Sequence, residues 1–175
     1  PIGTTPVMAH ATDAYGNLAE CGFSVTVLGA QGVKSNVLAE LTALRAATSL
    51  NDQFAGKFDS AIQHLSSSLT PRYWIDQTHL QARTGNTAMN EEKLCAARLQ
   101  EIMESKQCPV APAVLPSLIE RIVKCDRLLA MICIEEAARA GLHPRKVAED
   151  VEMVAKGDSE TAKGHYANAI EHYRN

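Results

Sequence analysis

The chain has 175 residues, of which 46% are hydrophobic and 21% charged, and its formal net charge is −3. This composition is typical of a folded globular protein of one or two small domains. Its 17 basic residues are balanced by 20 acidic ones and form no cluster, so a charge-driven partner such as nucleic acid is not expected. No apolar run approaches the ~18 residues of a transmembrane helix, so no membrane span is expected either.

Residues 4–28 have the pattern of two β-strands. Phe23, Val25 and Val27 point to one face of the second strand, and the residues between them point to the other. Residues 13–17 (Asp-Ala-Tyr-Gly-Asn) separate the strands and have the composition of a turn. The sequence therefore predicts a β-hairpin.

A hairpin with an apolar face needs a cover, because an isolated two-stranded sheet is only marginally stable in water. Two arrangements provide one. The helices that follow pack on Phe23, Val25 and Val27, or hairpins of two chains pair edge to edge in a larger sheet. We favour the second arrangement, a homodimer formed through the N-terminal strands.

Three segments carry a resemblance to a known family: Pro1–Val7, Ala11–Asn17 and Cys21–Val27. Together they resemble the last two strands of a hyalin-repeat (HYR) domain, an immunoglobulin-like β-sandwich of extracellular multidomain proteins. The resemblance covers about the first 28 residues and implies that most of the sandwich lies outside this sequence, since such a sandwich has about seven strands. It also implies that Cys21 has lost an upstream disulfide partner.

From Ser35 onward the pattern is helical and rich in Ala, Leu, Glu, Lys and Arg. The expected helices span residues 37–48, 52–69, 88–104, 114–141, 144–157 and 158–175. Short connections favour antiparallel neighbours, so the predicted fold is mainly α: an up-and-down helical bundle (35–175) preceded by a hairpin (1–30), with an interdomain linker at 29–32. Segments 121–130 and 157–173 resemble an all-helical tail found after such repeats in secreted bacterial proteins, which implies an extracellular location but no activity.

Five cysteines are present, and no two are arranged as Cys-x-x-Cys, so a zinc ribbon is not expected. If the helices at 88–104 and 114–141 are antiparallel neighbours, Cys95 and Cys125 lie at the same height and can form a disulfide. The alternative is that both are small buried apolar residues. An extracellular origin favours the disulfide.

Histidines give the best route to an enzyme, as metal ligands or general bases. Asp76 and His79 are three residues apart in an irregular segment that contains the only tryptophan, Trp74. They suit one metal ion, although a loop held by Trp74 packing and an Asp cap is the simpler interpretation. Glu92 and Cys95 have the same spacing. His165 and His172 lie on one face of the last helix, and a solvated polar face is the simpler interpretation of that pair.

Two functions follow from these patterns. The first is a structural or binding role within an extracellular, secreted bacterial protein of several domains. The second is a metal-dependent hydrolase of phosphate esters or phosphotriesters, with zinc or manganese held by Asp76, His79, His165 and His172, at an interface between two chains. The sequence contains no His-Glu-x-x-His motif in support of the second.

Overall fold

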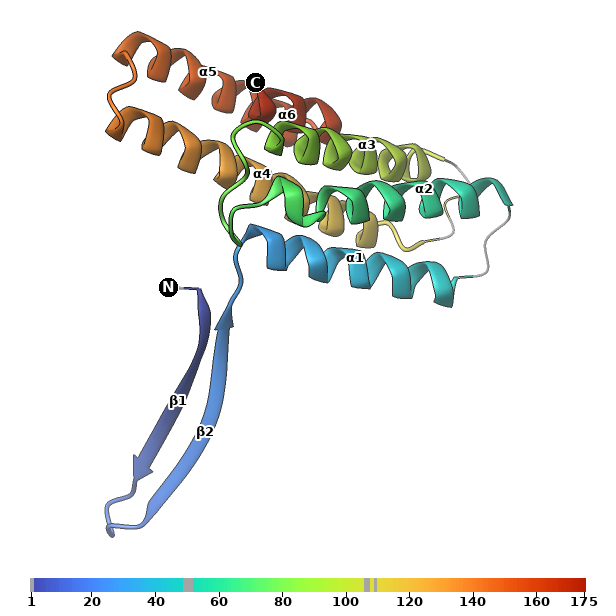
Figure 1. The fold of residues 1–175 in the computed structure, drawn as a ribbon. Coiled ribbons are helices and arrows are strands. Elements are labelled where there is room, and N and C mark those ends of the chain that lie inside the picture. Colours follow the sequence, from blue (N-terminus) through green and yellow to red (C-terminus); the bar gives the residue numbers. More distant parts are fainter. Residues whose placement is uncertain (1, 49–51, 106–107, 109) are drawn as a thin grey trace.

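The computed structural model describes residues 2–48, 52–105, 108 and 110–175. A β-hairpin is followed by a helical bundle, as predicted (Figure 1). The hairpin strands are β1 (Gly3–Thr12) and β2 (Leu18–Val27). The helices are α1 (Ala30–Ala47), α2 (Asp52–Ser68), α3 (Gly85–Met103), α4 (Val114–Arg139), α5 (Pro144–Ala162) and α6 (Tyr166–Arg174).

The helices form one body with a continuous apolar core. α3 packs mainly against α2 and α6. The long α4 packs against α1, α5 and α6 and has fewer contacts with α3. Phe58, Leu99, Ile122 and Ile170 are fully buried at the centre of this core. A smaller buried cluster around Trp74 joins Ala30 at the start of α1 to Cys125 and Leu129 of α4.

The expected linker at 29–32 is wrong, because α1 already begins at Ala30. The helix was expected to begin at residue 37, but Ser35 already lies inside it, and its hydroxyl donates to the carbonyl of Gln31 at 2.9 Å. The backbone N–H of Gln31 donates to the carbonyl of Gln77 at 3.0 Å. The loop between α2 and α3 thus holds the first turn of α1, and only Leu28 and Gly29 separate the hairpin from the bundle.

The boundary expected at Gly157 is also wrong. α5 continues through Gly157 to Ala162, and the chain turns at Gly164, whose φ is +76°. Gly157 is buried against the ring of Tyr173, and a Cβ at this position would collide with that ring. The glycine therefore permits close packing of α5 and α6 and does not end a helix.

The hairpin projects from the bundle (Figure 1). All residues of β2, and all residues of β1 except Val7, are exposed. The first arrangement considered above, in which the helices cover the apolar face, is therefore not the one adopted. A turn at 13–17 joins the strands, and Asp13 Oδ1 accepts from the backbone N–H groups of Tyr15 and Asn17, both at 2.9 Å.

Candidate functional site

The loop between α2 and α3, residues 69–84, is anchored by its tryptophan. Trp74 is 6% exposed, and its indole N–H donates to the carbonyl of Ser68 at 2.9 Å. A β-bridge between Trp74 and Leu80 closes the segment. Within it, Asp76 Oδ1 accepts from the backbone N–H of Thr78 at 2.7 Å. The simpler interpretation of this segment, a loop held by Trp74 and an Asp cap, is confirmed.

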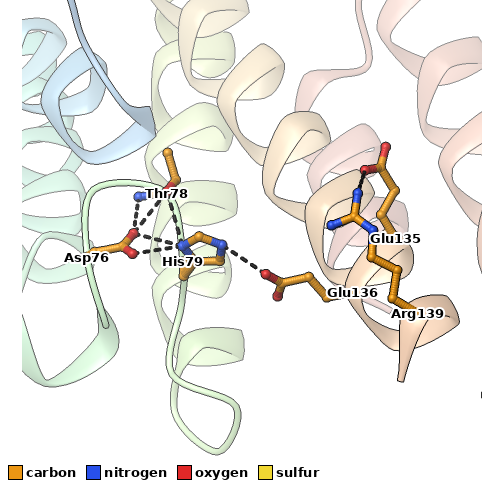
Figure 2. Close-up of polar contacts among 6 residues, drawn as sticks. All are labelled: Asp76, Thr78, His79, Glu135, Glu136 and Arg139. Atoms are coloured by element: carbon orange, nitrogen blue, oxygen red, sulfur yellow. Dashed lines mark hydrogen bonds and ion pairs between the residues drawn. The ribbon is translucent and has the colours of Figure 1, made fainter. Parts of the chain in front are cut away.

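This loop brings Asp76 and His79 together and adds Glu136 from α4 (Figure 2). His79 Nδ1 lies 2.9 Å from either carboxylate oxygen of Asp76, and Nε2 lies 3.1 Å from Glu136 Oε1. Backbone donation from Thr78, with a hydrogen bond to His79, lowers the pKa of Asp76 to about 2. The hydrogen bond to Asp76 raises the pKa of His79. A protonated imidazole between two carboxylates ties the loop to α4.

The other two histidines predicted as ligands lie elsewhere. His165 precedes α6, and its Nδ1 is 2.9 Å from Glu160 Oε2. His172 lines a groove of about 350 Å³ between α3, α4, α5 and α6, together with Cys133 and Tyr173. Throughout the part of the chain that the structure describes, no three His, Cys, Asp or Glu residues are placed to hold a metal ion. The predicted set of Asp76, His79, His165 and His172 is therefore not assembled within one chain.

The predicted Cys95–Cys125 disulfide is not formed, and all five cysteines are free thiols. The prediction took α3 and α4 as close antiparallel neighbours, whereas α3 packs mainly on α2 and α6. Cys95 consequently lies in the main core and Cys125 in the smaller cluster around Trp74. Burial raises the pKa of Cys125 to about 11 and raises that of Cys95 further, so both are held as neutral, buried thiols.

Both cysteines interact electrostatically with a buried cluster of charged groups. We call this cluster the core triad: Lys34 of α1, Glu92 of α3 and Asp126 of α4. Lys34 Nζ donates to Asp126 Oδ1 at 2.6 Å and lies 2.9 Å from Glu92 Oε2. All three side chains are fully buried. The ammonium group also lies over the ring of Trp74, 5.1 Å from its centroid, a cation–π distance.

The charges of the core triad do not balance if both acids are ionised. One lysine would then face two buried carboxylates, and an uncompensated buried charge is costly. Burial, repulsion from Glu92 and a hydrogen bond with it raise the pKa of Asp126 well above its usual value. Glu92 Oε1 and Asp126 Oδ2 are buried and accept no hydrogen bond. A proton on Asp126 neutralises the cluster and allows Asp126 to donate a hydrogen bond to Glu92.

The core triad was not predicted from the sequence as a unit, although each of its members carries a signal. Lys34 falls on the same helical face as Ala30, Val37 and Leu41, all buried. Glu92 and Asp126 interrupt the apolar faces of α3 and α4 in the same way. Charged residues on the core faces of three helices require partners of opposite sign, and this requirement predicts such a cluster.

Neither a family model nor a curated protein nor a solved structure matches this chain. Among the described residues, no helix combines the length and apolar character needed to cross a membrane.

Proposed function

We propose that this chain is a structural and binding module whose N-terminal hairpin associates with the hairpin of a second copy. The observation that carries the proposal is an apolar face of the hairpin that the described residues of the bundle leave uncovered. The resemblance of the strands to a hyalin repeat supports a setting in an extracellular bacterial protein of several domains. In this role the helical bundle is the support on which the hairpin is mounted.

The strand register defines the apolar face. Directly paired residues lie on the same side of a sheet, and the pairs include Val7 with Phe23 and Thr5 with Val25. Val27, Cys21 and several alanines complete this side. Phe23, Val25 and Val27 are 51%, 44% and 49% exposed. Such contiguous exposed apolar side chains are typical of an association surface.

The opposite face of the hairpin is more polar, and the β1 edge of the hairpin is less able to pair with a further strand. Ser24 and Thr26 lie on this face, and the Thr26 hydroxyl is 2.9 Å from that of Thr4. Pro6 in β1 has no N–H to offer a further strand, whereas β2 contains no proline. A second copy is thus best placed over the apolar face. At the edges of the sheet, β2 is better suited than β1 to pair with a further strand. Because the surface is the same on both copies, a two-fold symmetric dimer results.

The molar mass of the whole chain in solution tests the association. We expect a mass of two chains by light scattering after size exclusion, and a single-chain mass for Val25→Lys. Ser24→Lys is the matched control, since it adds the same charge at the adjacent position of β2 on the opposite face, and it should remain dimeric. A wild-type chain that stays single at high concentration, or equal loss of the dimer in both variants, would contradict the proposal.

One observation favours the metal-dependent hydrolase as a second candidate. His79 Nε2 and Glu136 Oε1 meet at the surface from two separate elements, and imidazole and carboxylate are ligands of zinc and manganese. Further ligands would come from a second copy. Elemental analysis of the purified chain, with hydrolysis of a phosphotriester before and after chelation, tests this candidate. A stoichiometric metal that is lost in His79→Ala supports it, and hydrolysis unaffected by chelation contradicts it.

A further inference from the structure

The core triad places an amine, a carboxyl group and a second carboxylate in mutual contact where water does not reach. The amine of Lys34 and the carboxyl group of Asp126 are separated by a single hydrogen bond of 2.6 Å. These residues are 92 positions apart in the sequence. The folded chain therefore holds together two groups that are able to condense, which removes most of the entropic barrier to their reaction.

Burial favours condensation over its reverse. Joining an amine to a carboxyl group releases a water molecule, and the reverse reaction needs water at the same place. All three side chains are fully buried, and Trp74 covers the lysine. The surrounding cluster, which includes Ala88 and Leu129, is apolar. In such an environment two charged groups are costly, whereas a neutral amide with satisfied hydrogen bonds is not.

The third residue supplies what the reaction requires of a catalyst. Burial alone would lower the pKa of Lys34, but Asp126 and Glu92 more than offset this, and the net pKa is raised. A proton must therefore leave the ammonium group before it can act as a nucleophile. Glu92 Oε2, 2.9 Å from Nζ, is positioned to accept that proton.

We propose that Lys34 and Asp126 become joined by an intramolecular amide bond, with Glu92 as the general base and acid of its formation. In the starting state the lysine is an ammonium ion, Glu92 a carboxylate and Asp126 a neutral carboxylic acid. Glu92 takes one proton from Nζ, and the free amine attacks the carboxyl carbon of Asp126.

The tetrahedral intermediate then loses water. A proton from the former amine, relayed by Glu92, is transferred to the departing hydroxyl group. The bond between Nζ and the carboxyl carbon forms, and one bond from that carbon to oxygen breaks. The products are a secondary amide, one water molecule and Glu92 in its protonated form. No oxidant, metal or cofactor is consumed.

The mass of the intact, denatured chain tests the bond directly. We expect the wild-type protein to be lighter than its sequence by one water molecule. A tryptic digest should contain a branched peptide in which Lys34 is linked to Asp126, with no cleavage after Lys34. Wild-type protein at its full sequence mass after prolonged incubation would overturn the proposal, and so would a loss of water that maps to other residues.

Variants test the roles of the individual groups. Lys34→Met and Glu92→Gln should both have their full sequence mass. Glu91→Gln is the matched control, because Glu91 is the neighbouring acid of α3 and pairs with His64 outside the core triad; this variant should retain the bond. If Glu92→Gln does not fold, Glu92→Met provides the same test, and the branched wild-type peptide decides the bond without any variant. Retention of the bond in a folded Glu92 variant would overturn the role of Glu92.

Discussion

Replacing Gly157 by alanine tests the packing of α5 on α6. The substitution adds one methyl group inside a helix, where alanine is normally the better residue by up to ~1 kcal/mol. At this position the added Cβ would collide with the Tyr173 ring, with the ring carbons Cδ1 and Cζ at 2.7 and 2.8 Å. Tyr173 is 5% exposed, and its hydroxyl donates to Asp158 at 2.8 Å. The ring therefore cannot move aside without breaking this partly buried hydrogen bond.

The magnitude follows from two opposing terms. Overpacking of this kind costs about 1–3 kcal/mol, and the helix-propensity gain of up to ~1 kcal/mol offsets part of this cost. We expect Gly157→Ala to lower the free energy of unfolding by the difference, up to about 2 kcal/mol. Gly56→Ala in α2 is the matched control, since its Cβ would meet nothing within 4 Å. That variant should be stabilised by about 0.5–1 kcal/mol.

Urea unfolding followed by far-UV circular dichroism measures both variants under the same conditions. In thermal melts the two should move in opposite directions, by about 2–4 °C for each kcal/mol in a chain of this size. Equal stability of Gly157→Ala and Gly56→Ala would refute the reasoning, because it would mean that Tyr173 does not restrict Gly157.

Three further predictions concern the loop, the thiols and the core. The pKa of His79 is raised, so the contacts of its imidazolium with Asp76 and Glu136 should contribute fully to stability below the unfolded pKa of about 6.5. This contribution should be lost as the pH rises through the higher folded pKa. Thermal melts of wild type and His79→Ala should therefore converge above neutral pH, and a constant difference would contradict this. Cys21 and Cys133 are exposed and Cys95 is buried, so a thiol reagent should modify Cys21 and Cys133 in the folded chain and Cys95 only after unfolding. Mass spectrometry of Cys21→Ser and Cys133→Ser should assign the early modifications. Phe58 is fully buried, so Phe58→Ala should cost about 3–5 kcal/mol in urea unfolding, and a cost below ~1 kcal/mol would show that this site is not part of a tight core.

Periodicity alone predicted the elements whose apolar residues follow one regular pattern. α2 and α4 begin where the sequence placed them, because an amphipathic face and a proline-rich boundary determine their extent. Helix boundaries that depend on tertiary contacts could not be predicted from periodicity. α1 begins early because Gln77, far away in the sequence, binds its first turn, and Gly157 continues a helix because Tyr173 packs on it.

In the candidate sites, too, local contacts were predictable from the sequence and tertiary contacts were not. The contact of Asp76 with His79 was predictable from a spacing of three residues, whereas the contribution of Glu136 required the packing of the loop on α4. The predicted disulfide failed because the neighbours of each helix were assigned from loop length alone. Sequence spacing gives the relative height of residues on two helices, but only packing determines which side chains face one another.

The positions of the hairpin and the core triad connect the two proposals. Force on an associated hairpin enters the bundle through Leu28 and Gly29 and reaches α1, whose first turns contain Lys34. If only hydrogen bonds and apolar contacts held α1 in place, a force along the hairpin would detach α1 from the bundle one turn at a time. An amide between Lys34 and Asp126 would pass the load directly to the middle of α4, which contacts α1, α5 and α6. The hairpin of Lys34→Met should therefore detach from the bundle at lower force than that of the wild type in single-molecule pulling, whereas the dimer mass in solution should be the same for both.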